Sequence, residues 1–304
     1  MISLTKTALR GSYPPVVTPF LNGEVDYDSY SNLIEHLIQG GSHGIVVNGT
    51  TAEPTTLSLQ ERSKLVDVAV KTAAGRVPVV AATGSQNYHE TLQLTKAAMQ
   101  SGVDALMIVT PYFLKPPVRG LVEYYVKLAS ETDLPVLIYH IPGRSGVSLP
   151  PSSIEQIAKR APNLVGVKHA STDLAFVTET LVRLGPDFRI FVGLEELSFP
   201  MMAIGAAGLM NAAGNIVPAK IAALAQAAMN EDMAKARQLH YELFELNQAI
   251  FWDTNPIPMK YMLYRMGILP NNEHRLPMMS ATPELELRLD VLLKDLNMPL
   301  SSVR

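Results

Sequence analysis

A lone lysine, Lys168, ends an otherwise apolar segment with the sequence Leu-Val-Gly-Val-Lys. Loss of water around a buried ammonium group lowers its pKa, and the resulting neutral amine is a nucleophile toward carbonyl carbon. A structural role is also open, with the alkyl stem packed on the core and the charged head in water. Taken alone, Lys168 suits that structural role, so a catalytic role depends on the residues that accompany it.

Polar side chains also follow other apolar segments. Thr50 and Thr51 form a pair of adjacent hydroxyls, Tyr139 lies near the end of a segment, and Arg144 follows it closely. An arginine fork binds a carboxylate, a buried phenol passes protons, and adjacent hydroxyls hold a second carboxylate. Each of these residues also has an ordinary structural interpretation: Thr50 and Thr51 as turn residues, Tyr139 as a core aromatic and Arg144 as a loop cation. Together with Lys168, this set of side chains indicates an enzyme that condenses a 2-oxo acid with a second carbonyl compound.

The elements that must position these residues alternate between strand-like and helix-like segments, roughly every 25 to 30 residues, as in repeated βα units. Most of the strand-like segments are continuous apolar runs, which is typical of parallel strands buried on both faces. Eight such units predict a closed (β/α)8 TIM barrel, whose active site lies at the carboxyl ends of the strands. The expected strands are residues 15–18, 44–47, 77–82, 105–109, 136–140, 164–168, 188–192 and 208–210.

Helix signals separate the strands and continue beyond them. Asp26 precedes an apolar stripe, and Ser58 with Glu61 and Asn87 with Glu90 have the spacing of N-terminal capping pairs. Strand signals end near residue 231. We therefore expect a catalytic barrel over residues 1–231 and a helical region over 232–304, with helices at 232–251, at 258–266 and from Thr282 onward.

Composition and charge exclude several function classes. The 304 residues include 47% hydrophobic and 17% charged residues, with a net charge of −3 and no cysteine. No basic run indicates nucleic acid, and no glycine-rich phosphate loop or dinucleotide fingerprint occurs. No His-Glu-x-x-His motif or carboxylate–histidine cluster indicates a metal, so we expect neither a metal nor an organic cofactor.

Membrane association and export are also not expected. The N-terminus lacks the apolar core of a signal peptide. The longest apolar stretch, residues 201–217, is interrupted by three glycines and two asparagines, which argues against a membrane span. The sequence therefore predicts a soluble, cytoplasmic protein.

Two histidines lie beside the candidate site. His140 and His169 each follow a strand-end residue, so alternation of side chains predicts that both point away from the barrel axis. They could form a buried pair behind the site. The interpretation favoured by the sequence is packing in a layer outside the barrel, with satisfied nitrogens.

Three motifs carry a family resemblance. Residues 49–53 are similar to a G-T-T-G-E turn with Ala52 at the second glycine, residues 139–144 to Y-x-x-P-x-R, and residues 166–168 to G-x-K. With these motifs the chain resembles, over nearly its whole length, the dihydrodipicolinate synthase / N-acetylneuraminate lyase family of Schiff-base barrels. Residues 255–260 (Asn-Pro-Ile-Pro-Met-Lys) and 275–278 (Arg-Leu-Pro-Met) are most similar to the synthase branch.

The resemblance implies a role for each matching residue. Lys168 would form an imine with pyruvate, Tyr139 would relay protons, and Thr50 would bond to Tyr139 and, with Thr51, hold the pyruvate carboxylate. Arg144 would bind the carboxylate of the incoming aldehyde, which in the synthase is L-aspartate 4-semialdehyde. The remaining implied residues are Gly193 and Met210, which supply backbone contacts, and Tyr112, which lies at a subunit contact in tetramers built from tight dimers.

Departures from the family pattern keep alternatives open. Phe113 replaces the tyrosine that completes a proton relay across the dimer, Asn211 replaces a more hydroxylic pattern, and His169 replaces an acidic residue. An aldolase or dehydratase of 2-keto-3-deoxy sugar acids, or of another 2-oxo acid, is the main alternative to the synthase. A barrel that binds a 2-oxo acid without turnover is another. Lysine feedback is not expected, because the pattern associated with it is absent at Pro54, Thr55, Leu59 and Arg62.

Overall fold

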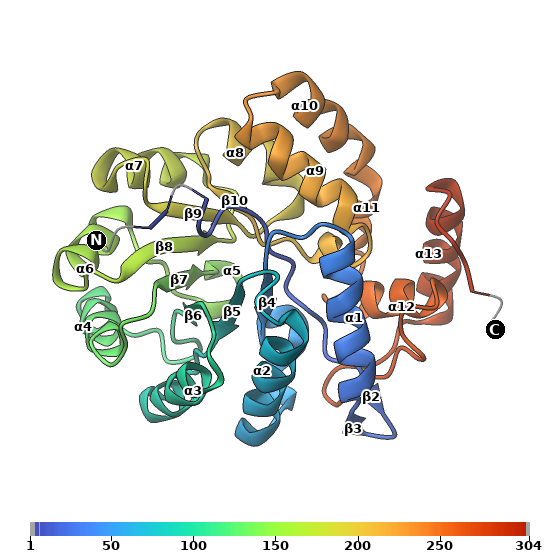
Figure 1. Cartoon of the computed structure of the whole chain (residues 1–304), viewed down its shortest axis with the longest axis horizontal. Coiled ribbons are helices and arrows are strands. Elements are labelled where there is room, and N and C mark those ends of the chain that lie inside the picture. Colours follow the sequence, from blue (N-terminus) through green and yellow to red (C-terminus); the bar gives the residue numbers. More distant parts are fainter. Residues whose placement is uncertain (1–3, 6, 302–304) are drawn as a thin grey trace.

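The computed structural model describes residues 4–5 and 7–301, and it confirms the predicted TIM barrel. Eight parallel strands lie in the order β1-β10-β9-β8-β7-β6-β5-β4, and a bridge between Pro15 and Val46 joins the two ends of the sheet. Helices surround the strands (Figure 1). The strands are β1 (Gly11–Ser12), β4 (Ile45–Val47), β5 (Val79–Ala82), β6 (Ala105–Val109), β7 (Val136–His140), β8 (Leu164–His169), β9 (Arg189–Val192) and β10 (Gly208–Leu209).

The first strand differs from the expectation of residues 15–18. Its ladder bonds are made by Gly11 and Ser12 with β10, and Pro15 contributes only the closing bridge. Proline has no N–H to donate, so the bridge is made by its neighbours: the N–H of Val16 donates to the carbonyl of Val46, and the carbonyl of Pro14 accepts from the N–H of Val46. The apolar signal in this segment comes from Val16 and Val17, which are buried in the core without belonging to a strand.

An antiparallel hairpin that was not expected follows β1. Its strands are β2 (Phe20–Leu21) and β3 (Glu24–Val25), joined by Asn22 and Gly23, both at positive φ. Asn-Gly between two short strands is a strong hairpin signal because both residues tolerate this conformation.

The helix signals in the barrel are largely confirmed. Asp26 caps α1 (Tyr27–Gln39), and Ser58 with Glu61 forms a complete capping box on α2 (Leu59–Ala73). Asn87 caps α3 (Tyr88–Ser101), whereas the carboxylate of Glu90 accepts a bond from Ser85. The other barrel helices are α4 (Val118–Ala129), α5 (Pro142–Ser145), α6 (Pro151–Arg160), α7 (Leu174–Leu184), α8 (Ser198–Ala203) and α9 (Pro218–Met229).

The C-terminal region is helical, but its first helix is divided. Residues 232–251 form α10 (Met233–Glu242) and α11 (Phe244–Ala249), which meet at Leu243. The division lets α10 pack on α9 while α11 packs on residues 195–197 and on α13. The later helices are α12 (Ile257–Arg265) and α13 (Pro283–Asp295), capped by Thr282; Figure 1 shows both outside the ring of barrel helices. The division of the chain at residue 231 stays a prediction.

The barrel interior is packed with apolar side chains. Tyr13, Val46, Met107 and Phe191 belong to one buried cluster that fills the space enclosed by the strands. Such filling is typical of TIM barrels and leaves the carboxyl ends of the strands as the open face. None of the helices in the described residues is long and apolar enough to cross a lipid bilayer.

Candidate active site

Lys168 lies near the end of β8, where its neighbours across the sheet are Tyr139 on β7 and Phe191 on β9. It is buried, and its Nζ lies 4.4 Å from the centroid of the Tyr139 ring. Gly193 follows β9, and a Cβ atom at that position would lie 3.0 Å from Cε of Lys168. The absence of a side chain at Gly193 therefore leaves room for the lysine.

The hydroxyl pair lies on a short helix at the end of β4. In η1 (Thr50–Ala52), Oγ1 of Thr50 lies 3.2 Å from the hydroxyl of Tyr139. Oγ1 of Thr51 accepts a bond of 3.1 Å from Nδ2 of Asn255, which comes from the segment before α12. Thr50 thus couples to the phenol beside Lys168, and Thr51 is fixed by the C-terminal region.

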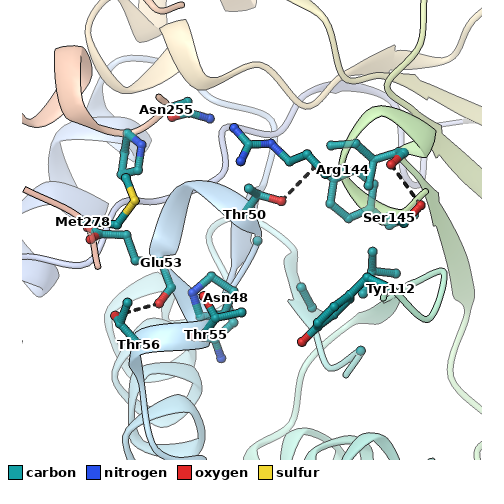
Figure 2. A pocket seen from close by; sticks show the side chains of 18 of the residues that line it. Asn48, Thr50, Glu53, Thr55, Thr56, Tyr112, Arg144, Ser145, Asn255 and Met278 are labelled. Carbon is teal, nitrogen blue, oxygen red and sulfur yellow. Dashed lines mark hydrogen bonds between the residues drawn. The ribbon is translucent and has the colours of Figure 1, made fainter. Parts of the chain in front are cut away.

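One cavity of about 300 Å³ brings most of the predicted residues together. A second cavity of about 260 Å³ shares Thr50, Tyr139, Arg144 and Asn255 with it, and Tyr112 lines only this second one. Figure 2 shows the second cavity, with the exposed Arg144 side chain extending across it in the direction of Asn255. The predicted residues lining the first cavity are Thr50, Thr51, Tyr139, Arg144, Lys168, Gly193 and Met210.

Glu195 is a lining residue that the sequence reasoning missed. It lies in η3 (Glu195–Leu197), two residues after Gly193, and is buried in the wall of the first cavity. Burial raises the pKa of its carboxyl group above the ordinary value. The available signal was its position, because a carboxyl group directly after a barrel strand belongs to the same open face as Lys168.

His140 and His169 form a buried pair, and they also pack outside the barrel with partners for all four ring nitrogens, so both sequence interpretations apply. The two Nδ1 atoms lie 3.1 Å apart, and both rings stack on Phe176 of α7. The N–H of Leu149 donates to Nε2 of His140, so the proton of His140 is on Nδ1 and is donated to His169. His169 in turn donates from Nε2 to the carbonyl of Asp173. Desolvation lowers the pKa of each ring to about 4, so both are neutral at pH 7.

A buried ionic cluster joins the threonine turn to the C-terminal region. Oε1 of Glu53 lies 3.0 Å from Nζ of Lys260, and Oε2 lies 3.0 Å from Nδ1 of His274. The three side chains are about 1% exposed, and burial lowers the pKa of Lys260. Because Glu53 directly follows η1, this cluster helps to fix the position of Thr50 and Thr51.

Of three residues that depart from the family pattern, two line neither cavity and one lines the second cavity. Phe113 is 87% exposed, has a φ of 73° and lines neither cavity. Asn211 also lines neither cavity; it is buried and donates to Oγ of Ser198. Arg62 lines the second cavity and donates to the carbonyls of Ala82 and Gly84. Within residues 4–5 and 7–301, no group of three or more His, Asp or Glu side chains is placed to hold a metal ion.

Comparison with known proteins agrees with this geometry. The model of the dihydrodipicolinate synthetase family matches residues 8–296. A 4-hydroxy-tetrahydrodipicolinate synthase of Thermus thermophilus is 45% identical over 281 residues, which cover 92% of this chain and 94% of that protein. The enzyme of the same name from Aquifex aeolicus is 39% identical over 293 residues, covering 96% and 99%. The crystal structure of dihydrodipicolinate synthase from Aquifex aeolicus superposes with a TM-score of 0.94 at 39% identity, covering 96% of this chain and 100% of that one.

Proposed function

The chain belongs to the dihydrodipicolinate synthetase family, and from this premise we propose that it condenses pyruvate with L-aspartate 4-semialdehyde through an imine on Lys168. The observation that carries the proposal is the placement of a buried lysine, a phenol and a threonine hydroxyl in the wall of one cavity. To form an imine, an amine and its carbonyl partner must exchange protons with a nearby acid or base. The hydroxyls of Tyr139 and Thr50, which contact each other, supply a path for these protons.

In the proposed reaction, the amine of Lys168 adds to the ketone carbon of pyruvate, and the ketone oxygen leaves as water. Loss of a methyl proton gives an enamine, whose carbon attacks the aldehyde carbon of the second substrate. Tyr139, 3.2 Å from Thr50, relays protons when the amine adds to the ketone and when the enamine forms and reacts. The hydroxyl and N–H groups of Thr50 and Thr51 hold the pyruvate carboxylate, and Gly193 and Met210 contact the substrate through the backbone.

The second substrate is selected by its carboxylate. Arg144 is exposed at the point where the two cavities meet, so its guanidinium is available for a bidentate contact with an incoming anion. This location suits an aldehyde that enters after pyruvate is bound. Arg144 should therefore affect binding of the second substrate and leave imine formation unchanged.

A homotetramer built from dimers is part of the proposal. Tyr112 lines the second cavity, and the next residues, Phe113 and Leu114, are 87% and 69% exposed. Neighbouring apolar side chains with this exposure are typical of an interaction surface. A second copy of the chain packed here would place an aromatic residue close to the site.

The experiment that tests this proposal is reduction by borohydride in the presence of pyruvate. We expect a mass gain on Lys168 in the wild-type protein, none in Lys168→Ala, and a normal gain in Lys159→Ala, since Lys159 is a surface lysine with 71% exposure. Folded wild-type protein that gains no mass would refute imine chemistry with pyruvate and would favour a barrel that only binds a 2-oxo acid.

A second measurement identifies the aldehyde. We expect turnover of pyruvate with L-aspartate 4-semialdehyde, detected as the condensed product by mass. If pyruvate is trapped on Lys168 but no condensed product forms with L-aspartate 4-semialdehyde, the alternative of a 2-keto-3-deoxy acid as substrate is favoured. Phe113 is then the first residue to test, because it lacks the hydroxyl of the synthase tyrosine and is exposed.

A further inference from the structure

Glu195 has an unusual position for a carboxyl group. It is the only Asp or Glu among the described residues that line the Lys168 cavity, and it is 2% exposed. Its Oε1 accepts a short bond of 2.6 Å from the N–H of Ala212, whereas its Oε2 is buried without a hydrogen-bond partner in the described part of the chain. A buried carboxyl oxygen without a partner costs free energy, so its retention in a cavity wall calls for a function.

The backbone of Glu195 is held in place by a buried polar network. The carbonyl of Glu195 accepts bonds from Oγ of Ser198 at 2.5 Å and from Nδ2 of Asn247 at 3.4 Å. Oγ of Ser198 accepts in turn from Nδ2 of Asn211 at 2.5 Å. The side chains of these partners are all buried. The unpartnered oxygen therefore belongs to a fixed residue, and Asn211 acts on the site through this network.

The charge of Glu195 depends on the charge at Lys168. Burial, the largest effect, raises the pKa of Glu195, while the N–H of Ala212 and a positive charge on Lys168 favour its carboxylate. Lys168 has no carboxylate oxygen within 4.0 Å among the described residues, so its charge is not neutralised by a direct ion pair. A positive charge on Nζ of Lys168 therefore favours the ionised form of Glu195, and the protonated form is favoured when that nitrogen is uncharged.

We propose that Glu195 is the acid of the dehydration step at Lys168: its carboxyl group lies in the wall of the same cavity with one oxygen unpartnered, and it supplies the proton with which the carbinolamine oxygen leaves. This inference rests on the imine proposed above. In the carbinolamine, the C–O bond breaks, the nitrogen lone pair forms the C=N bond, and the leaving hydroxyl takes up the proton of Glu195 to depart as water. The neutral carbinolamine and the protonated acid become an iminium and a carboxylate, and the net charge of the buried site does not change. Glu195 is therefore a catalytic residue for this step, because its proton passes to a reacting atom.

The test compares Glu195→Gln, which is neutral and cannot release a proton, with the matched control Glu196→Gln. Glu196 bonds to Gln248 and lines neither cavity. Imine formation with pyruvate is followed by borohydride trapping and mass across a range of pH. Wild type should show a bell-shaped profile, with a descending limb as Glu195 loses its proton. Glu195→Gln should lose that limb and trap at least ~10-fold more slowly at the wild-type optimum, in line with general acid effects.

The outcomes separate this inference from the proposed function. A wild-type rate and an unchanged pH profile in Glu195→Gln would overturn the inference while leaving the imine intact. Absence of trapping in wild type would overturn both. Glu195→Asp retains an ionisable group, so it should retain a descending limb; loss of the limb in this variant while it remains folded would also overturn the role of ionisation.

Discussion

The buried pair of Glu53 and Lys260 predicts a large and specific loss of stability in Lys260→Met. Nζ of Lys260 lies 3.0 Å from Oε1 of Glu53 and 4.4 Å from the ring centroid of Phe20, with about 1% exposure of both charged side chains. Methionine fills a similar volume but supplies no donor. Among residues 4–5 and 7–301, the carboxylate of Glu53 would keep only the 3.0 Å contact from Nδ1 of His274.

The magnitude follows from the burial of the pair. Removing one partner of a buried ion pair leaves an uncompensated charge and costs about 3–5 kcal/mol. Unfolding entropy is about 2.1 cal/mol/K per residue, which over 304 residues gives roughly 0.64 kcal/mol/K. Dividing the free-energy loss by this unfolding entropy predicts that the Tm of Lys260→Met is about 5–8 °C below that of wild type.

A double-mutant cycle in scanning calorimetry, at one protein concentration, measures this effect. Because Glu53→Gln, Lys260→Met removes both charges, its loss should be smaller than the sum of the single losses by about 1–3 kcal/mol. Lys159→Met is the control, because Lys159 pairs with Glu155 at 71% exposure and should change stability by less than about 1 kcal/mol. Additive single effects, or a Lys260→Met loss as small as that of the control, would refute the reasoning.

Three further predictions concern the histidine pair, the glycine beside the lysine and the missing phenol. Because the folded state keeps His140 and His169 at a pKa of about 4 against an ordinary 6.5, only the unfolded state gains protons as pH falls through this range. Stability should therefore fall by roughly 3 kcal/mol per ring between pH 6.5 and 4; a urea midpoint equal at pH 7 and pH 5 would contradict this. Gly193→Ala places Cβ 3.0 Å from Cε of Lys168, so trapping with pyruvate should slow about tenfold while circular dichroism is unchanged. Phe113→Tyr should raise kcat with L-aspartate 4-semialdehyde, since acid–base groups contribute ~10²- to 10⁴-fold; an unchanged rate would show that the site functions without this hydroxyl.

The sequence was sufficient to predict the barrel and most of its open face. Parallel strands in a barrel end at one face, so Thr50, Tyr139 and Lys168 could be brought together from the order of the strands alone. The prediction failed where local signals conflict or where burial depends on distant residues. The apolar residues Val16 and Val17 predicted a strand, although pairing in this segment is limited to the single bridge at Pro15.

Glu195 shows the second kind of failure. Its position after β9 was visible in the sequence, but its buried state depends on partners such as Asn247 that lie far along the chain. The same holds for the division at Leu243, which follows from packing of α10 and α11 on different neighbours. Periodicity within one segment contains no information on such contacts.

The C-terminal region takes part in shaping the site, although it adds no strand to the barrel. Glu53 adopts a left-handed conformation at φ 55°, which is unfavourable for a residue with a side chain. This conformation ends η1, the short helix that contains Thr50 and Thr51, and the N–H of Glu53 donates to the carbonyl of Thr50. Lys260 and the Asn255 amide, both from beyond residue 231, bond to Glu53 and Thr51 respectively. A turn that is locally unfavourable is thus stabilised by contacts from outside the barrel, so loss of these contacts should displace the hydroxyls before it disturbs the strands.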